Sequence, residues 1–301
     1  MSNPINITFL GTSQAIPTAK RNHTSILLQY TGENILIDCG EGTQRQFRKA
    51  QLNPCKITRL LITHWHGDHI LGIAGLLQTL LLNGYSKTLY IYGPKGTKND
   101  LSDLIHLLVP YNKIPLKVEE VHEGKFLETK DFYIEAIPLQ HSIPCNAYAF
   151  VEKDKTRLDR KKLKQLKIPN SPLLGELANG KDIVLNGKKI KAKDLIYEEK
   201  GKKVAIILDT ALIDNCYKIA KNSDLLISES VYLKDEEELA RLHEHLTAEQ
   251  AGEVAKKANA KKLYLAHLSQ RYDGKERLIL KEAKTKFKDT FIAEDLMQIE
   301  V

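Results

Sequence analysis

Residues 60–72 read LLITHWHGDHILG and place three histidines and one aspartate within six positions, directly after an apolar run. His64 and His66 lie two residues apart, so in extended backbone their side chains project to the same side. Asp68 and His69 fall where a helical segment is expected to begin. An aspartate at that point can simply cap a helix. Four nitrogen and oxygen donors at this spacing nevertheless indicate metal binding, and together they suit two ions rather than one.

Three further candidate ligands stand just past the end of an apolar run: His141, Asp209 and His267. A single histidine at a strand end is often structural, and a single aspartate there is often a turn residue. Strand ends that converge at one edge of a sheet are, however, where α/β proteins build their sites. We therefore expect these side chains to complete two ligand sets with the histidine-rich stretch.

The rest of the chain alternates short apolar runs with segments of helical spacing, which predicts an α/β fold. Strands are expected at residues 5–11, 25–30, 34–40, 59–64, 88–93, 132–141, 204–210, 225–230 and 262–267. Helices are expected at residues 41–52, 70–83, 96–109, 211–222 and 246–259. With 301 residues, 42% of them hydrophobic and 28% charged, the chain has an ordinary globular composition and can bury a sizeable core.

Neither a membrane-spanning segment nor a secretory signal is visible, so a cytoplasmic protein is expected. The longest apolar stretch, residues 70–82, is shorter than the roughly 20 residues that a spanning helix needs. The N-terminus lacks a basic region followed by a long apolar one. The four cysteines are far apart and form no CxxC motif, which argues against a thiolate zinc cluster and a disulfide framework.

The net charge of +7 is concentrated in one segment. Residues 151–203 contain 16 Lys and Arg against 8 Asp and Glu, so the other 248 residues are close to neutral. Turn-forming Pro and Gly residues punctuate this segment, and VLNGKKI at residues 184–190 predicts a hairpin with an Asn-Gly turn. A charge run is often only a solvated face. An inserted basic arm, residues 151–200, on a near-neutral body instead favours a polyanionic partner, and nucleic acid before membrane.

Several stretches resemble known sequences. THWHGDH resembles the HxHxDH signature of the metallo-β-lactamase fold, an αββα sandwich of two mixed sheets flanked by helices. Other stretches are similar to the short-form ribonuclease Z enzymes, which are tRNA 3′-processing endonucleases. These stretches are FLGTSQAIPTAKRN (9–22), ILIDCGEGTQRQ (35–46), LDTA (208–211), HEHLTAEQAG (243–252) and AHLSQRY (266–272). The resemblance implies one metallo-β-lactamase-fold domain over residues 1–301 with an inserted tRNA-binding arm.

The resemblance also implies a ligand set and a cofactor. One metal ion would be held by His64, His66 and His141, a second by Asp68, His69 and His267, with Asp209 bridging the two. Nitrogen and oxygen donors suit two Zn²⁺ ions per chain, with Mn²⁺ or Co²⁺ as substitutes. Asp38 resembles a buried acid that orients the histidine loop, although it reads equally well as a turn carboxylate.

The same resemblance suggests the chemistry. Two metal ions would generate a bridging hydroxide that attacks the phosphodiester and releases the 3′ trailer of precursor tRNA. Asp68 would accept a proton, His245 would protonate the leaving ribose oxygen, and Glu229 would orient His245 and raise its pKa. Glu229 reads almost as well as an ordinary strand-end carboxylate. Leu246 stands where the family usually has a serine.

The expected RNA-contacting residues lie in three stretches: Lys20, Arg21 and Asn22 in the N-terminal loop, Arg271 near the C-terminus, and Lys161, Lys162 and Lys164 in the arm. Short-form relatives are homodimers, so a homodimer that binds precursor tRNA is expected. One alternative is a metallo-β-lactamase-fold hydrolase of small phosphodiesters, sulfate esters or thioesters, which leaves the basic arm unexplained. The other is a non-catalytic RNA-binding protein, which predicts gaps among the ligands.

Overall fold

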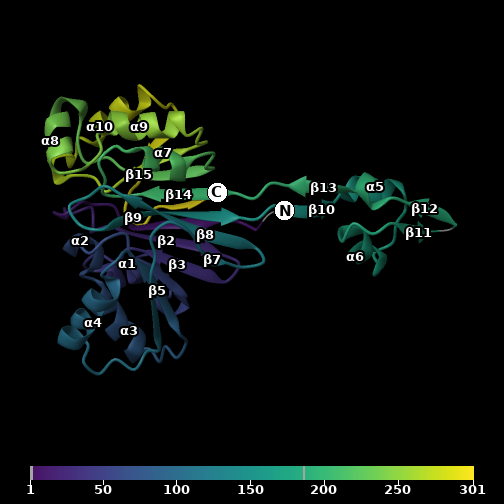
Figure 1. Cartoon of the computed structure of the whole chain (residues 1–301), viewed down its shortest axis with the longest axis horizontal. Helices are drawn as coiled ribbons and strands as arrows, with labels where there is room; N and C mark the ends of the chain where they lie inside the picture. The colour runs from purple at the N-terminus through teal and green to yellow at the C-terminus, as the bar shows by residue number, and fades with distance from the viewer. Residues whose placement is uncertain (1–2, 186) are drawn as a thin grey trace.

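A computed structural model describes residues 3–185 and 187–301. Two seven-stranded sheets face each other, helices cover their outer faces, and a slender arm projects from one end (Figure 1). The first sheet contains, in spatial order, β18 (Gln298–Glu300), β1 (Asn6–Gly11), β2 (Ser25–Tyr30), β3 (Glu33–Ile37), β4 (Arg59–Leu61), β5 (Leu89–Gly93) and β6 (Leu116–Glu120). The second contains β17 (Thr290–Ile292), β16 (Leu263–Ala266), β15 (Leu225–Glu229), β14 (Lys203–Ile207), β9 (Cys145–Glu152), β8 (Phe132–Leu139) and β7 (Gly124–Glu128).

Helices pack on the outer face of each sheet, which completes the expected αββα sandwich. The first sheet is covered by α1 (Thr43–Lys49), α3 (Ile73–Leu82) and α4 (Thr97–Leu108), with the short α2 (Gly67–Ile70) at its edge. The second is covered by α7 (Asp214–Ala220), α9 (Ala248–Lys257) and α10 (Glu276–Lys284), next to α8 (Glu237–Leu242). Among the described residues, no helix combines the length and apolarity that crossing a membrane requires.

The apolar runs of the sequence are continuous because many strands are buried on both faces. In β2, Ile26 and Leu28 enter the core between the sheets, whereas Leu27 enters the core under the first-sheet helices. In β14, Val204 likewise faces the inter-sheet core and Ala205 faces the helices of the second sheet. Successive side chains of a strand point to opposite faces, so one strand contributes to two cores.

The expected helix at residues 70–83 corresponds to α3, and the short helix α2 precedes it as a separate element. α2 ends at Ile70 and α3 begins at Ile73. Gly72 separates them, and its N–H donates to the Cys39 carbonyl at 2.9 Å. A Cβ atom on Gly72 would come within 2.0 Å of the Gly40 carbonyl oxygen. The close approach of the two loops therefore requires glycine, and it holds the histidine-rich stretch against the end of β3.

The basic segment forms a projection with a small core of its own. β10 (Lys155–Leu158) and β13 (Ile196–Glu199) pair as an antiparallel stalk. Beyond the stalk lie α5 (Arg160–Gln165), α6 (Leu173–Ala178), β11 (Ile183–Leu185) and β12 (Lys188–Ile190). Leu163, Leu177 and Ile183 are buried together there, in a cluster separate from those of the body. The projection begins after residue 152, because Val151 and Glu152 still pair with β8 in the second sheet.

The predicted hairpin is present within the arm. β11 and β12 pair with Leu185 opposite Lys188, which leaves a two-residue loop. Gly187 has a φ of 75°, a left-handed conformation that glycine adopts without strain. The predicted Asn-Gly turn also includes residue 186, which lies outside the described residues.

The separate core of the arm predicts local unfolding. Leu177→Ala removes a fully buried side chain from that core, a change that typically costs about 2–5 kcal/mol. Hydrogen exchange followed by mass spectrometry should then show faster exchange in residues 155–199 and unchanged exchange in the sandwich. Leu76→Ala, in the core under the first-sheet helices, should instead accelerate exchange in the sandwich and leave exchange in residues 155–199 unchanged. Equal acceleration everywhere in the Leu177→Ala variant would show that arm and body unfold as one unit.

Candidate metal centre

All seven expected ligands come together at one edge of the sandwich. The loop after β4 carries His64, His66, Asp68 and His69 from the first sheet. His141, Asp209 and His267 follow β8, β14 and β16 of the second sheet. These strands run in the same direction within each sheet, so their carboxyl ends meet at a common edge. The seven side chains form two groups of close donors that can hold metal, and a third such group joins Asp209 and His267 with His245.

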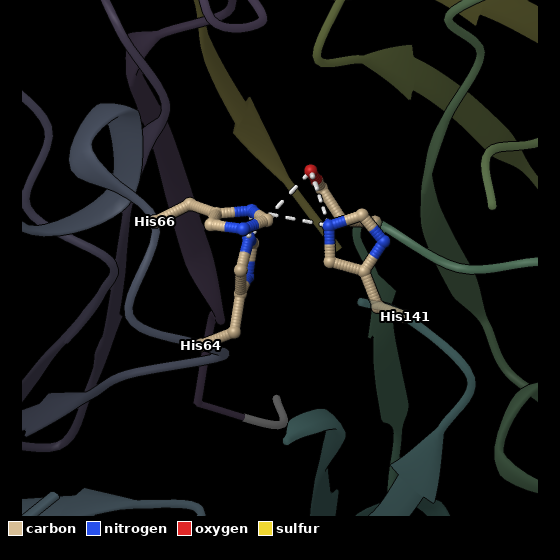
Figure 2. Close-up of side chains that lie close together, drawn as sticks. His64, His66 and His141 are labelled. Carbon is tan, nitrogen blue, oxygen red and sulfur yellow. Dashed lines mark hydrogen bonds and ion pairs between the residues drawn. The ribbon is translucent and has the colours of Figure 1, made fainter. Parts of the chain in front are cut away.

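The first group consists of three imidazoles and one carboxylate. The rings of His64, His66 and His141 point toward a common centre (Figure 2). The Nδ1 atom of His66 lies 3.0 Å from Nε2 of His64 and 3.1 Å from Nε2 of His141. Asp209 Oδ2 lies 3.7 Å from the His64 nitrogen. Donors around a tetrahedral zinc ion, with Zn–N bonds of about 2.0–2.1 Å, are separated by similar distances of roughly 3.3 Å.

The second group consists of Asp68, His69 and His267, and the other oxygen of Asp209 faces it. Asp68 Oδ2 lies 3.3 Å from Nε2 of His69. Asp209 Oδ1 lies 3.4 Å from that nitrogen and 3.0 Å from Nε2 of His267. The two oxygens of one carboxylate thus face two different ligand groups, which is the geometry of a bridging ligand.

Asp38 organises two of the imidazoles from behind. Its Oδ1 accepts the Thr63 N–H at 2.7 Å, and its Oδ2 accepts the Thr63 hydroxyl at 2.7 Å. The same Oδ2 lies 2.6 Å from Nδ1 of His69, so that nitrogen carries a hydrogen. Because the Thr63 hydroxyl donates to Asp38, it accepts from Nδ1 of His64 at 3.0 Å. Both histidines are therefore held with Nε2 toward the ligand groups, which is how outer carboxylates orient metal ligands.

Thr24 and a backbone carbonyl do the same for the second-sheet histidines. The Thr24 hydroxyl donates to the Ser13 carbonyl at 2.8 Å and accepts from Nδ1 of His267 at 2.6 Å. Nδ1 of His141 lies 3.3 Å from the Glu244 carbonyl, which only accepts hydrogen bonds. With Nδ1 engaged in this way, His267 and His141 both present Nε2 to the centre. Thr24 has no motif of its own in the sequence, so its role emerges only from the fold.

The electrostatics of the centre call for a cation. Nε2 of His69, Nε2 of His267 and Oδ1 of Asp209 are buried without a hydrogen-bond partner. Burial lowers the pKa of His69, but Asp209, Asp38 and Asp68 raise it well above its usual value. Burial and the neighbouring imidazoles hold the pKa of His64 well below its usual value. A divalent metal would supply the positive charge and satisfy the unpartnered atoms, so the donor set fits zinc, manganese or cobalt.

A cleft of about 590 Å³ opens in front of both ligand groups. His245 lines this cleft, with its ring centroid 5.4 Å from that of His141. Nδ1 of His245 lies 3.2 Å from both carboxylate oxygens of Glu229. Burial lowers the pKa of His245, but the Glu229 carboxylate more than compensates and raises it to about 9. Leu246, the unexpected residue of this loop, is fully buried in the core beneath the second-sheet helices.

The expected RNA-contacting residues of the N-terminal loop differ in their surroundings. Lys20 is exposed, and Asn22 donates to the Glu41 carbonyl at 2.6 Å. The Arg21 side chain is buried instead, with Nη1 donating at 2.7 Å to both Thr12 and the Ala293 carbonyl. Its guanidinium thus holds the loop against the body and has a structural role.

The remaining expected contacts are exposed. Arg271 lies beside the cleft, where its guanidinium covers the ring of the cleft residue Tyr232 at 5.7 Å and pairs with Glu236 at 2.9 Å. Lys161, Lys162 and Lys164 are exposed on α5, at the far side of the stalk from the cleft of the same chain.

The fold and this edge define a metallo-β-lactamase-fold protein. The crystal structure of the metallo-β-lactamase fold protein YhfI from Bacillus subtilis covers 100% of both chains with a TM-score of 0.73 at 22% identity. The short form of human tRNase Z matches 98% of each chain with a TM-score of 0.70 at 26% identity.

Sequence similarity over the full length of the chain identifies the family within this class of protein. The ribonuclease Z of Methanothermobacter thermautotrophicus is 40% identical over 299 residues, which cover 99% of this chain and 97% of that protein. The chain belongs to the ribonuclease Z family. Residues 5–157 also match the family model described as Anti-Pycsar protein Apyc1. That match contains the ligand candidates up to His141 and ends within the first strand of the arm.

The Thr24 hydrogen bond predicts a change in metal affinity. Thr24→Val removes the hydroxyl that fixes the His267 ring, and removal of such an outer partner typically weakens metal binding about 10–100-fold. Competition with a chromophoric chelator measures the zinc affinity. Thr24→Ser, which keeps the hydroxyl, should retain nearly normal affinity. If valine and serine variants bind zinc equally well, the hydroxyl does not orient the ring.

Proposed function

We propose that this protein is a zinc-dependent endoribonuclease that hydrolyses a phosphodiester to remove the 3′ trailer of precursor tRNA. The observation that carries the proposal is the Asp209 carboxylate, whose two oxygens face two complete ligand groups in a chain that is 40% identical to a ribonuclease Z over its whole length. Since precursor tRNA is the substrate, we propose that the enzyme works in the cytoplasm.

We assign two Zn²⁺ ions to the centre, with Mn²⁺ or Co²⁺ as substitutes. His64, His66 and His141 would hold one ion, Asp68, His69 and His267 the other, and Asp209 would bridge them. When bound, such a pair lowers the pKa of a shared water and neutralises charge on the phosphodiester oxygens.

Two groups of the chain handle protons in this proposal. Burial raises the pKa of the Asp68 carboxyl, but the imidazoles of His69 and His267 lower it below its usual range. Asp68 is therefore ionised where it lines the cleft, and there it can accept a proton from the attacking water.

His245 is the general acid in this proposal. Because Nδ1 is engaged by Glu229, Nε2 is the atom that delivers a proton to the leaving ribose oxygen.

The arm supplies affinity for the RNA. Residues 151–203 carry a formal charge excess that suits the phosphates of a tRNA. Lys161, Lys162 and Lys164 are the proposed arm contacts, and Lys20, Asn22 and Arg271 are the proposed contacts of the body.

The direction of the arm supports a homodimer. β9 begins at Cys145, near the ligand edge, and ends at Glu152, where the arm begins. The two ends of such an eight-residue strand are about 25 Å apart, so the arm leaves the body at the end opposite its own cleft. A tRNA at one cleft would thus meet the arm of a second copy.

The proposed homodimer is tested by its mass in solution. Light scattering after size exclusion should give twice the chain mass of 34.1 kDa.

Asp209→Ala tests the bridge. Removing the carboxylate should reduce metal content and abolish cleavage of precursor tRNA and of bis(p-nitrophenyl) phosphate alike, because both groups lose a ligand. Metal per chain is measured by inductively coupled plasma mass spectrometry. Asp224→Asn, outside the centre, should keep both metal and activity. A variant with a full metal complement and nearly normal rates would refute the bridging role.

His245→Ala separates proton delivery from metal binding. The variant should keep its metal and its tRNA affinity but lose roughly 10²–10⁴ in the rate of precursor tRNA cleavage. A nitrophenyl phosphodiester, whose leaving group needs little protonation, should lose much less. Glu229→Gln should show the same selectivity to a smaller degree. Equal fractional losses on both substrates would remove His245 from the list of catalytic residues.

The arm lysines predict a change in salt dependence. Replacing Lys161, Lys162 and Lys164 together by Ala should weaken tRNA binding and flatten its salt dependence, by about 0.7–0.9 in the log–log slope for each phosphate that is no longer neutralised. Hydrolysis of bis(p-nitrophenyl) phosphate should be unchanged.

A charge-matched control removes three exposed lysines from the second-sheet helices: Lys256, Lys281 and Lys284. If this control flattens the salt dependence as much as the arm variant, the arm has no special role in binding.

A further inference from the structure

The junction between arm and body contains a buried polar cluster that the reaction does not use. It consists of Tyr30, Glu152 and Lys155, and is called the neck cluster below. Tyr30 ends β2 of the first sheet, Glu152 ends β9 of the second sheet, and Lys155 begins β10 of the arm. The three side chains therefore connect the first sheet, the second sheet and the arm.

The cluster is joined by short hydrogen bonds. Glu152 Oε1 accepts the Tyr30 hydroxyl at 2.7 Å and the Lys155 ammonium at 2.7 Å. The Lys155 ammonium also donates to the Tyr30 hydroxyl oxygen at 2.8 Å. The Tyr30 hydroxyl serves as both donor and acceptor, so the three groups close a ring of bonds. Such charge-assisted bonds are stronger and more directional than neutral ones.

Burial makes this cluster rigid rather than a loose surface pair. Tyr30 and Glu152 are 1% and 3% exposed, and the Lys155 side chain is 20% exposed. The Tyr30 ring packs edge-on against Phe150 at 5.2 Å, inside the core between the sheets. Removing one partner from a buried ion pair leaves an uncompensated charge, which is far more costly than removing both.

The segment that leads from β13 back to β14 passes close to Glu152. The Glu152 N–H donates to the Lys202 carbonyl at 2.9 Å, and a Cβ atom on Gly201 would come within 1.9 Å of the Glu152 carbonyl oxygen. Both strands of the neck are thus fixed around Glu152. Another pair in the neck, Lys200 with Asp154 at 2.6 Å, is solvent-exposed and holds neither strand to the sheets.

We propose that the neck cluster sets the direction in which the arm leaves the body, and that Glu152 and Lys155 are positioning residues for precursor tRNA. This inference rests on the proposed function for its substrate. A fixed arm presents its lysines to the tRNA at a defined place, whereas a loosely hinged arm must be ordered on binding, which costs affinity. The cluster contacts no part of the metal centre, so its effect should be confined to substrates that reach the arm.

The decisive variant is Glu152→Gln combined with Lys155→Met. It removes both charges, so the stability lost in either single variant should be largely recovered, while the bond between body and arm stays broken. We expect KM for precursor tRNA to rise about 3–10-fold, with unchanged kcat and unchanged hydrolysis of bis(p-nitrophenyl) phosphate. Tyr30→Phe, which keeps the buried ring, should give a smaller rise of the same kind.

Lys200→Met is the matched control, because it also removes one positive charge from the neck but breaks only exposed pairs, those with Asp154 and Glu198. Any change in its KM should match the loss of one charge and vanish at high salt. The change in the double variant, whose net charge equals that of the wild type, should persist at high salt.

The arm direction is measured independently of activity by electron–electron double resonance. Spin labels are attached at Lys87→Cys on the body and Val184→Cys on the arm, with Cys55→Ser added and the labelled chain diluted with unlabelled chain. The other cysteines, Cys39, Cys145 and Cys216, are buried. The wild type and Lys200→Met should give one narrow distance distribution, and the double variant a broad or displaced one.

Unchanged distances and unchanged KM in a folded double variant would overturn the proposal and leave the cluster with a purely structural role. A lower melting temperature alone would do the same. If the wild type cleaves no precursor tRNA, the proposed function fails, but the distance measurement still decides whether the cluster directs the arm.

Discussion

The structure depends on one buried carboxylate that faces two sets of imidazoles. Asp209 follows β14 of the second sheet, yet its nearest neighbours include His64 and His69 from the loop after β4 of the first sheet. The two sheets must therefore stack so that the loops after their strands bring these side chains within about a hydrogen-bond length of one another. The inter-sheet core, the glycine contact between the loops of Gly72 and Gly40, and the Asp38 network all serve that alignment. Charge is the reason that precision is needed, since Nε2 of His69, Nε2 of His267 and Oδ1 of Asp209 are buried without a hydrogen-bond partner unless a cation joins them.

Much of the fold and the ligand set could be predicted from the sequence, because both leave a local signal. Strands buried on both faces appear as unbroken apolar runs, and ligands stand just beyond them, as His267 does after residues 262–266. β9 is absent from the expected strands, since its small and polar residues weaken the apolar pattern even though it lies inside its sheet, between β14 and β8. α10 was missed because charged residues dominate its exposed face and only Ile279 and Ala283 are buried.

The hydrogen bonds that tune the site were harder to predict because they join residues distant in the chain. Thr24 and His267 are separated by 243 positions, and no local pattern marks a threonine as the partner of a distant imidazole. The surroundings of Arg21 were equally hidden in the sequence. A basic residue in a loop of a nucleic-acid enzyme suggests a phosphate contact, but here its guanidinium fills a buried position between Thr12 and Ala293. Sequence gives the type of a side chain, whereas only the fold decides whether it faces solvent.

The order of strands in the first sheet has a consequence for how the protein is made. β18, from the last residues of the chain, pairs with β1, from the first residues. The ligands follow the same order of synthesis, since His64, His66 and His141 emerge well before Asp209 and His267. Chains fold from the N-terminus as the ribosome releases them. The imidazoles of His64, His66, His69 and His141 are thus made before the carboxylate that faces both groups, and the centre cannot be completed until His267 has left the ribosome.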